Sequence, residues 1–519
     1  MTVTTGVNAR TSIRFLRKGK IVELSDVGPN ETVLDYLRLR DHSKGTKEGC
    51  CEGDCGACTV AIGQLEHGQV EHGQQENAQV TYQPVNACIQ LLGTLEGKEL
   101  VTVDDLASSD GTLHPVQSAL VKHHGSQCGF CTPGFVMSLF VLYQNAQNAQ
   151  SANAPDRAQI NQALAGNLCR CTGYRPIVDA ALEACRHKKA DDPQAQRPRS
   201  DGFSQLSSED DIFIGDENRF FASPASEQTL AQLRTDHKDA VLVAGASDVG
   251  LWMTKQLRDL PKIIYLGRVA ALQQIEQTDK KLRIGAGVTY AKACEALTRI
   301  SPGIGAIIRR IGAAQVRAVA TIGGNIANGS PIGDMPPMLI ALDAQIELKN
   351  SKAARWLNLA DFFIAYGKQD IARDEYLSLI DIPLLAGDQH LCCYKISKRF
   401  DQDISSVMAA FRFTVTDAVV SDVRLALGGM AATPKRASKT EAAMNGLKLD
   451  DATGWTRAAA QLAEDFSPLS DMRASADYRL ATAIALLEKS RIELASHNKP
   501  DVAGPGQPQT RLYGGPHVA

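Results

Sequence analysis

Four cysteines near the start of the chain have spacings that suit an iron–sulfur cluster. The segment KEGCCEGDCGAC (47–58) places three of them in the order C-x4-C-x2-C, and a fourth follows in NACIQ. This order is one by which thiolates hold a [2Fe-2S] cluster. The expected ligands are Cys50, Cys55, Cys58 and Cys88. Gly49, Gly53 and Gly56 give the loop the backbone freedom to bend around a metal cage, which leaves Cys51 as a spare thiol. Ordinary buried or disulfide-bonded cysteines are the alternative.

Four further cysteines form a second set in SQCGFCTPG and GNLCRCTGYRP. They are Cys128, Cys131, Cys169 and Cys171. Pairs of cysteines beside glycines at helix ends can converge across a helical bundle into one four-thiolate site. Tetrahedral zinc sites use similar C-x2-C arms, so the spacing leaves an iron–sulfur cluster and a structural zinc both open.

Composition narrows the class of protein. The 519 residues are enough for several domains of about 100 to 200 residues each. With 55 basic and 58 acidic residues the net charge is −3, which favours neither nucleic acid nor an anionic membrane surface as partner. The start of the chain lacks an uninterrupted apolar signal segment, and no stretch approaches the length of a membrane span. Thirteen cysteines in such a chain indicate metal rather than disulfides, and we expect a soluble cytoplasmic protein.

The first half of the chain divides into a small sheet domain and a helical domain. Residues 12–24 predict two short strands about a Lys-Gly turn, and 31–40 predict a helix. With the cysteine loop these make a ferredoxin-like domain over 10–95. Four helical segments follow within 96–188: HPVQSALVKHH, PGFVMSLFVLYQNA, INQALAG and IVDAALEACRHK. Prolines stand where these helices begin. The polar inserts at 64–80 and 144–157 are expected to be surface loops.

The second half has a different pattern. Residues 189–211, rich in Pro, Ser and charge, predict a linker. Strands such as AVLVAG, KIIYL, KLRIGAG and AQIEL then alternate with helical segments, which predicts an α/β domain over 212–388. A last domain over 389–495 has strands around CCYKIS, FRFTV and VRLALGG, followed by helices. Residues 496–519 predict a disordered tail.

Two glycine-bearing stretches in the second half could face phosphates. VLVAGASDVGLWM (241–253) predicts a strand, a Gly-Ala-Ser turn and the start of a helix, where backbone N–H groups face an anion. TIGGNIANGSPIGDMPP (321–337) predicts an irregular run that closes as a backbone nest on a pyrophosphate. A plain strand-to-helix turn and a long surface loop are the alternatives. Together with iron–sulfur ligands, the two stretches favour a dinucleotide redox cofactor.

Read together, these motifs closely resemble the molybdenum hydroxylase family, and within it the iron–sulfur/FAD subunits of the bacterial xanthine dehydrogenase group. The resemblance rests on KEGCCEGDCGACTV, NAC, QCGFCTPG, CRCTGYRP, VLVAGASDVG and TIGGNIANGSPIGD, and it covers about 10–490. It implies a multidomain α+β fold with four parts: a plant-ferredoxin-like β-grasp domain, a helical-bundle [2Fe-2S] domain, an α/β FAD-binding domain of the molybdenum hydroxylase (PCMH) type, and a C-terminal α+β flavoprotein domain. It also implies that the second cysteine set holds [2Fe-2S] rather than zinc.

The resemblance assigns site residues one by one. The two clusters take the two cysteine sets named above. FAD is expected along Leu242, Val243, Ala244, Gly245, Ala246, Ser247, Asp248 and Val249, and along Thr321, Ile322, Gly323, Gly324 and Asn325. Further FAD contacts are expected at Ile311, Asp334, Leu377 and Lys395. Ile311 departs from the aromatic residue that many animal relatives carry, which puts a ring-stacking contact in doubt. Cys51, Cys185, Cys294, Cys392 and Cys393 receive no role.

The activity implied is electron transfer in purine oxidation. No catalytic residue for the purine is expected on this chain, because a partner subunit with molybdopterin would convert hypoxanthine to xanthine and xanthine to urate. Electrons would pass through two [2Fe-2S] clusters to FAD, which reduces NAD+, in a heterotetramer of two small and two large subunits. The charged run SKRFDQD (397–403) is expected near the flavin, where it would favour NAD+ over oxygen as the electron acceptor. The alternatives are the same build acting on an aldehyde, an N-heterocycle or an aryl thioester, and a stand-alone iron–sulfur flavoprotein electron carrier.

Overall fold

The computed structural model describes residues 9–66, 79–148, 154–186 and 200–497. Most of the first polar insert (64–80), the middle of the second (144–157), the first part of the predicted linker and nearly all of the predicted tail lie outside these ranges. Strands β3 (Thr59–Glu66) and β4 (Gln79–Asn86) border the first insert. Helix α3 (Thr132–Asn148) runs into the second insert, so 144–148 are helical and not the predicted loop, and α4 (Arg157–Leu164) begins at its other end.

The first domain is a mixed five-stranded sheet in the order β2-β1-β5-β3-β4. Strands β1 (Ile13–Arg17) and β2 (Lys20–Leu24) form an antiparallel hairpin. Its turn residues Lys18 and Gly19 both have positive φ, the backbone twist that a two-residue hairpin requires. β5 (Glu99–Val101) runs parallel to β1. The predicted helix over 31–40 begins as α1 (Val33–Asp35) and continues as a π-helical turn, Tyr36–Arg40.

The helical domain packs four helices on the edge of this sheet. Besides α3 and α4 these are α2 (Pro115–Lys122) and α5 (Arg175–Ala184). Proline occupies the first or second position of α2, α3 and α5, where its missing N–H costs no hydrogen bond. Phe135 and Phe140 of α3 are buried in a core that includes Tyr82 of β4. The shared core holds the two cysteine-bearing domains together.

Part of the predicted linker is helical instead. Helix α6 (Ser200–Leu206) packs Phe203 and Leu206 against Leu16 of β1. Two apolar side chains at i and i+3 are too few to stand out in a polar segment, but burial against the first sheet is enough to order it.

The third domain consists of two sheets with helices around them. The first sheet has the order β6-β7-β9-β8, formed by β6 (Ile212–Gly215), β7 (Phe220–Ser223), β9 (Lys262–Tyr265) and β8 (Val241–Val243), with α7 (Glu227–Asp236) and α8 (Val249–Thr254). The second has the order β10-β11-β16-β12-β13, formed by β10 (Ile275–Gln277), β11 (Lys281–Gly285), β16 (Tyr376–Pro383), β12 (Gln345–Lys349) and β13 (Ala354–Asn358).

Six helices and two short strands surround the second sheet. The helices are α9 (Tyr290–Ile300), α10 (Pro302–Ile308), α11 (Ala314–Val319), α12 (Ile322–Asn328), α13 (Met335–Ala341) and α14 (Leu359–Phe362), and a small pair of strands is β14 (Phe363–Ala365) with β15 (Lys368–Gln369). The run 321–337, predicted to be irregular, is therefore mostly helical. Ile322, Ile326, Met335 and Met338 are fully buried, and this packing overrides the poor helix propensity of Gly and Asn.

The last domain is an antiparallel sheet covered by helices. Its strands are β17 (Gln389–Ile396), β18 (Val407–Thr416), β19 (Val419–Gly428) and β20 (Lys435–Arg436), paired in that order. Helices α15 (Ser438–Met444), α16 (Ala452–Ala459), α17 (Leu462–Asp465) and α18 (Ala476–His497) follow. Trp455 of α16 is buried against Phe413 of β18 at 5.6 Å between ring centroids.

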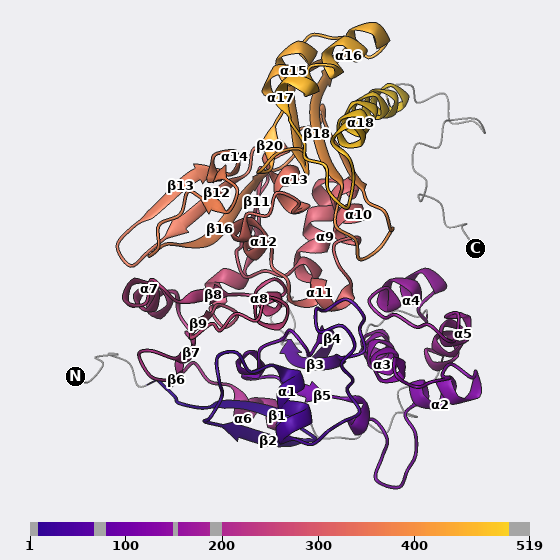
Figure 1. Ribbon diagram of the computed structural model, residues 1–519, viewed down its shortest axis with the longest axis vertical. Coiled ribbons are helices and arrows are strands. Elements are labelled where there is room, and N and C mark those ends of the chain that lie inside the picture. Colours follow the sequence, from indigo (N-terminus) through magenta and orange to yellow (C-terminus); the bar gives the residue numbers. More distant parts are fainter. Residues whose placement is uncertain (1–8, 67–78, 149–153, 187–199, 498–519) are drawn as a thin grey trace.

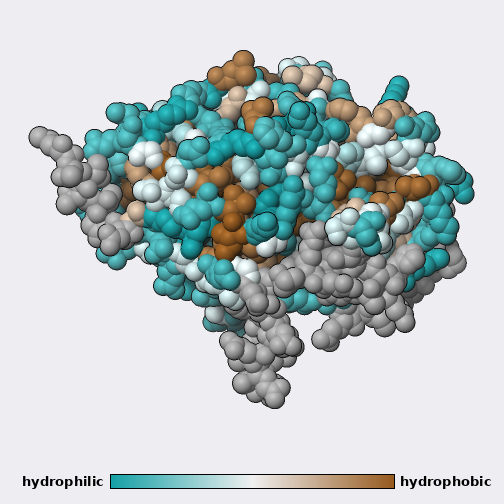
Figure 2. Space-filling model, turned by 90° about the horizontal axis from the view of Figure 1, so that it is seen from below, coloured by the Kyte–Doolittle hydropathy of each residue, from teal (hydrophilic) through white to brown (hydrophobic). Residues whose placement is uncertain are grey.

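The arrangement in space follows the order of the domains. The two cysteine-bearing domains lie side by side at one end, the third domain lies in the middle, and the sheet of β17 to β20 with its helices forms the other end (Figure 1). The predicted multidomain α+β fold class is confirmed. Seen from the end with the first sheet, hydrophobic residues are scattered among hydrophilic ones (Figure 2). Among the described helices, none combines the length and hydropathy needed to cross a membrane.

Candidate functional site

The first cysteine set is brought together as two pairs. The Sγ atoms of Cys58 and Cys88 lie 3.3 Å apart, and the backbone N–H of Cys55 donates to Cys50 Sγ at 3.3 Å. Cys58 and Cys88 are buried. A hydrogen bond with the Cys55 thiol lowers the pKa of Cys50 to about 5, and the same bond raises the pKa of Cys55. One thiol of this pair is therefore stabilised as a thiolate, the form that binds metal.

The second cysteine set is also paired, and it lies nearer the surface. Hydrogen bonds join Cys131 to Cys169 and Cys128 to Cys171. Burial is the main reason that the pKa of Cys131 is raised to about 12. Burial also acts on Cys169, but the hydrogen bonds from Thr172 outweigh it and lower the pKa of that thiol. Cys128 and Cys171 are exposed.

This pairing fits a two-iron cluster. Each iron of a [2Fe-2S] cluster takes two protein thiolates, whereas a single zinc gathers all four around one point. Within the described residues, no group of three or more His, Cys, Asp or Glu side chains is placed to hold one metal ion. Asn86 Nδ2 donates to Gly53 O at 2.8 Å and fixes the first loop to the end of β4. Cys51 lies beside this loop, and burial raises the pKa of its thiol to about 12.

Glycines in both predicted flavin stretches lie against neighbouring backbone. A Cβ on Gly245, in the turn after β8, would overlap the Val319 carbonyl at the end of α11, and one on Gly323, in α12, would overlap Ala286, which follows β11. Gly324 differs: only Thr321 Oγ1, at 2.8 Å, lies near its Cβ direction. The Thr321 hydroxyl accepts from the Gly324 N–H and caps α12. The outer side of Gly324 thus remains open to a ligand.

Two polar atoms beside these stretches are buried without a partner. Tyr290 Oη and Asn325 Oδ1 have no hydrogen-bond partner within the described structure. Burial raises the pKa of Tyr290, and Asp334 and Asp248 add to the effect, so both carboxylates lie near its ring. Burial also raises the pKa of Asp248. Buried polar groups normally have partners, and these groups fit a cofactor with hydroxyl and phosphate groups.

The remaining predicted flavin contacts surround the same region. Lys395 on β17 donates to Asp334 Oδ2 at 2.5 Å, and Ser405 Oγ donates to Asp334 Oδ1 at 2.5 Å. Leu377 is buried in the same core that Ile311 packs against. The structure therefore brings Asp334 and Lys395 into contact and holds both between the third and last domains.

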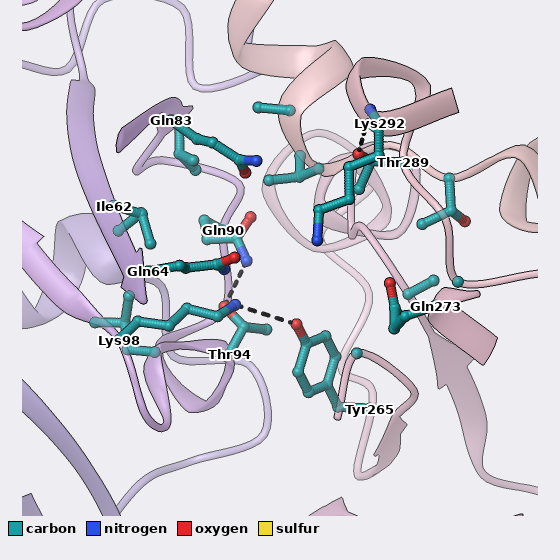
Figure 3. Close-up of a pocket in the computed structure, with 18 residues that line it drawn as sticks. Ile62, Gln64, Gln83, Gln90, Thr94, Lys98, Tyr265, Gln273, Thr289 and Lys292 are labelled. Atoms are coloured by element: carbon teal, nitrogen blue, oxygen red, sulfur yellow. Dashed lines mark hydrogen bonds between the residues drawn. The ribbon is translucent and has the colours of Figure 1, made fainter. Parts of the chain in front are cut away.

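A polar cavity of about 140 Å³ lies between the first and third domains (Figure 3). It is lined by Ala244 and Thr321 from the two predicted flavin stretches, with Lys98 and Lys292 extending from opposite walls. Lys98 Nζ donates to Tyr265 Oη at 3.4 Å. Pockets for ligands of drug size measure about 300 to 1,000 Å³. This cavity adjoins the flavin region, but it is too small for a dinucleotide.

Comparison with known families agrees with this geometry. Residues 17–92 match the 2Fe-2S iron-sulfur cluster binding domain and 102–182 the [2Fe-2S] binding domain. Residues 217–385 match the FAD binding domain in molybdopterin dehydrogenase, and 392–494 the CO dehydrogenase flavoprotein C-terminal domain. The chain belongs to the molybdenum hydroxylase family.

The relatives of this molybdenum hydroxylase chain include much longer proteins. It is 32% identical to xanthine dehydrogenase of Drosophila subobscura, over 94% of this chain and 39% of the relative, and 31% identical to xanthine dehydrogenase of Oryza sativa, over 81% and 35%. The chain thus spans about two-fifths or less of their length. Among solved structures, a carbon monoxide dehydrogenase from Hydrogenophaga pseudoflava (TM-score 0.50, 25% identity) covers 52% of this chain and 94% of its own. The reconstituted enzyme from Oligotropha carboxidovorans (0.50, 26%) covers 53% and 96%.

Several contacts of this molybdenum hydroxylase chain had no sequence signal. Lys255 of the flavin half donates to the Cys50 carbonyl and pairs with Glu52 at 3.5 Å. Gln402 Nε2 donates to Asp54 O at 3.2 Å. Tyr290 opens a helix and reads as an ordinary core residue. Only its proximity to the carboxylates of Asp248 and Asp334, far away in sequence, distinguishes it.

The buried pair Lys395–Asp334 gives a stability prediction for the flavin half. The change Lys395→Met leaves a buried carboxylate, 8% exposed, without its counter-ion. We expect a loss of about 3 to 5 kcal/mol, seen as a lower urea midpoint for flavin release. The control Lys122→Met breaks an exposed pair with Glu183 and should cost less than about 1 kcal/mol. Adding Asp334→Asn to Lys395→Met should restore part of the loss; equal midpoints for both lysine variants would contradict this account.

Proposed function

We propose that this chain is the electron-transfer part of a xanthine dehydrogenase. A molybdopterin-binding partner would hydroxylate hypoxanthine to xanthine and xanthine to urate, and this chain would carry the electrons to NAD+. The relatives named xanthine dehydrogenase support the substrate, and the four matched domains support the carriers. We place the assembly in the cytoplasm as a heterotetramer of two small and two large subunits, in keeping with the family resemblance.

The observation that carries the proposal is the unequal exposure of the two cysteine sets. Cys58 and Cys88 are buried, whereas Cys128 and Cys171 are exposed. Around the exposed pair lie three large apolar side chains, Phe130, Leu168 and Tyr174, each at least 40% exposed. Exposed apolar patches mark protein interaction sites, and the potential of an iron–sulfur centre depends on shielding from solvent. A partner that covers this patch would deliver electrons at the second set.

The first cysteine set lies against the flavin half, where it would pass electrons on to FAD. Its loop is contacted from the flavin half by Lys255 at the Cys50 carbonyl and by Gln402 at the Asp54 carbonyl. Leu168, beside Cys169, donates its backbone N–H to Cys55 O at 3.0 Å and links the two sets. The order from surface to flavin half is therefore second set, first set, flavin stretches.

When bound, two [2Fe-2S] clusters on these eight cysteines would supply one-electron carriers and FAD would supply hydride chemistry toward NAD+. The chain's own residues position and shield these groups. Tyr290 and Asn325 offer unpaired polar atoms toward FAD, and Gly324 leaves its diphosphate room. Lys395 pairs with Asp334 beside the flavin region.

The loop SKRFDQD (397–403) is proposed to bias the acceptor toward NAD+. Arg310 donates to the carbonyls of Lys395 and Phe400, and its guanidinium lies 4.7 Å from the Phe400 ring centroid. The loop is thereby tied to the flavin half at one end and to the first cysteine loop, through Gln402, at the other. The loop carries Lys398 and Arg399, whose charges are balanced by Asp401 and Asp403. The two cations would attract the phosphates of a dinucleotide.

Native purification followed by assay tests the proposal. A molybdenum-bearing chain should co-elute, and the complex should reduce NAD+ with hypoxanthine and release urate. If a molybdenum-bearing complex oxidises an aldehyde or an N-heterocycle but not hypoxanthine, the proposed substrate is wrong and the other one takes its place. The structural likeness to carbon monoxide dehydrogenases favours this outcome. Intact NADH oxidation with no molybdenum partner would leave a stand-alone electron carrier.

A further inference from the structure

The side chain of Gln315 joins the flavin half to both cysteine-bearing domains. It lies in α11 and is 1% exposed. Its Nε2 lies within hydrogen-bond distance of three oxygens: Thr59 Oγ1 at 3.2 Å, Ser138 Oγ at 3.2 Å and Asn167 Oδ1 at 3.1 Å. Thr59 belongs to the first domain, and Ser138 and Asn167 belong to the helical domain. Three domains therefore meet at one buried amide.

The partners of Gln315 stand next to the predicted cluster ligands. Thr59 directly follows Cys58, and Asn167 precedes Cys169 by two residues. Both converge on the Gly56 carbonyl, to which Asn167 Nδ2 donates at 3.2 Å and Thr59 Oγ1 at 2.7 Å. Ser138 Oγ donates to Asn167 Oδ1 at 2.7 Å. Through Thr59 and Asn167, the Gln315 amide therefore contacts the chain segments that carry ligands of both cysteine sets.

At this point the two cysteine loops touch without intervening side chains. A Cβ on Gly56 would overlap the Gly166 carbonyl, one on Gly134 would overlap the Gly56 carbonyl, and one on Gly166 would overlap Gln315 Oε1. The hydrogen bond from Leu168 N–H to Cys55 O, 3.0 Å long, completes a path from Cys55 to Cys169. Electron tunnelling falls steeply with distance and is favoured along covalent and hydrogen bonds, so small displacements here change the rate.

We propose that Gln315 is a positioning residue that sets the contact between the two cluster-bearing loops. Its two N–H donors hold Thr59, Ser138 and Asn167 together, so the flavin half controls the spacing between the clusters. The inference rests on the proposed function, because it takes the two clusters to be carriers in series.

Stability does not explain this amide. Gln315 Oε1 is buried with no hydrogen-bond partner among the described residues, a loss that an apolar side chain of the same size would avoid. In a Gln315→Leu protein the Ser138 and Thr59 hydroxyls keep Asn167 Oδ1 and Gly56 O as acceptors. We therefore expect that variant to fold and to keep its iron and flavin, while the contact between the loops changes.

The test compares full-length wild type, Gln315→Leu and the control Gln345→Leu, all loaded with iron and flavin. Gln345 is an exposed amide of the same domain, and its Nε2 donates to Asn358 Oδ1 at 3.3 Å. In the fully reduced proteins, the spin–spin splitting between the two clusters should differ in Gln315→Leu and stay unchanged in Gln345→Leu. After pulsed one-electron reduction, transfer between the clusters should slow on the order of tenfold in Gln315→Leu alone.

Each outcome decides the proposal. Wild-type protein with fewer than two clusters would overturn the proposed function, and this inference with it. Two clusters with unchanged splitting and rate in Gln315→Leu would overturn the inference alone. Should Gln315→Leu fail to fold, Ser138→Ala removes one of the three acceptors and should alter the splitting in the same direction by less. Unchanged splitting in Ser138→Ala would then overturn the inference.

Discussion

Replacing Cys128 with serine is expected to remove one of two iron–sulfur clusters and leave the rest of the protein intact. Cys128 is exposed and pairs with Cys171, so the change opens no cavity. A serine hydroxyl ionises far less readily than a thiol and is a harder ligand than iron–sulfur clusters select. Iron should fall from about four to about two per chain. If the proposed function is right, electron flow from hypoxanthine to NAD+ should fall by more than about 10- to 100-fold, the loss typical of a missing outer-shell partner.

The matched control for this prediction is Cys51→Ser. Cys51 neighbours Cys50 in the first loop but is predicted to be a spare thiol, so that variant should keep all its iron and both paramagnetic signals. Metal analysis measures the iron content of both variants, and low-temperature EPR measures their paramagnetic signals. Unchanged signals in Cys128→Ser, or the loss of a cluster in Cys51→Ser, would refute the ligand assignment.

Replacing Gly324 with aspartate is expected to empty the flavin site while both clusters remain. The new carboxylate would point from the N-terminus of α12 toward the place proposed for the FAD diphosphate, since only Thr321 Oγ1 lies in its way. Two like charges about 4 Å apart repel by roughly 1 kcal/mol in water and by roughly 4 kcal/mol near a protein surface. That repulsion weakens flavin binding on the order of 10- to 1,000-fold.

Two controls separate charge from bulk. Gly324→Asn has nearly the same shape without the charge and should retain more flavin than Gly324→Asp. Gly387→Asp adds a charge to the same half where no atom lies within 4 Å and should bind flavin normally. Flavin released on denaturation, measured by absorbance and divided by iron, gives the comparison. Equal flavin content in wild type and Gly324→Asp would contradict the placement of FAD.

The cysteine motifs and the elements around them could be predicted from sequence because their signals are local. Helices with proline at the first turn and apolar residues at i and i+3 or i+4, such as α2 and α5, follow from spacing alone. So do β8 and β9, which are short and mostly apolar, and β11 and β12, in which polar and apolar residues alternate. In all of these, propensity and tertiary packing favour the same structure.

Where the structure differs from the sequence prediction, packing opposes local propensity. Residues 321–337 contain Gly, Asn and Pro and read as irregular, but Thr321 caps α12 and Ile322, Ile326 and Met335 are fully buried. Helix α6 forms in a polar segment because Phe203 and Leu206 reach Leu16. Neither contact can be read from the segment itself.

The site beyond the motifs depends on contacts between distant residues. Gln315 meets Thr59 across 256 positions and Asn167 across 148, and nothing in AAQVRAV indicates such partners. Lys255 and Gln402 reach the first cysteine loop from the flavin half in the same way. The pairing of thiols within each set is likewise a property of the folded loops.

Potentiometric titration of the purified full-length protein, followed by EPR and combined with iron and flavin analysis, tests the central claim most directly. The account predicts two paramagnetic centres with different midpoint potentials, about four irons and about one flavin per chain. A single centre in fully metal-loaded protein, with zinc on the second cysteine set, would contradict it.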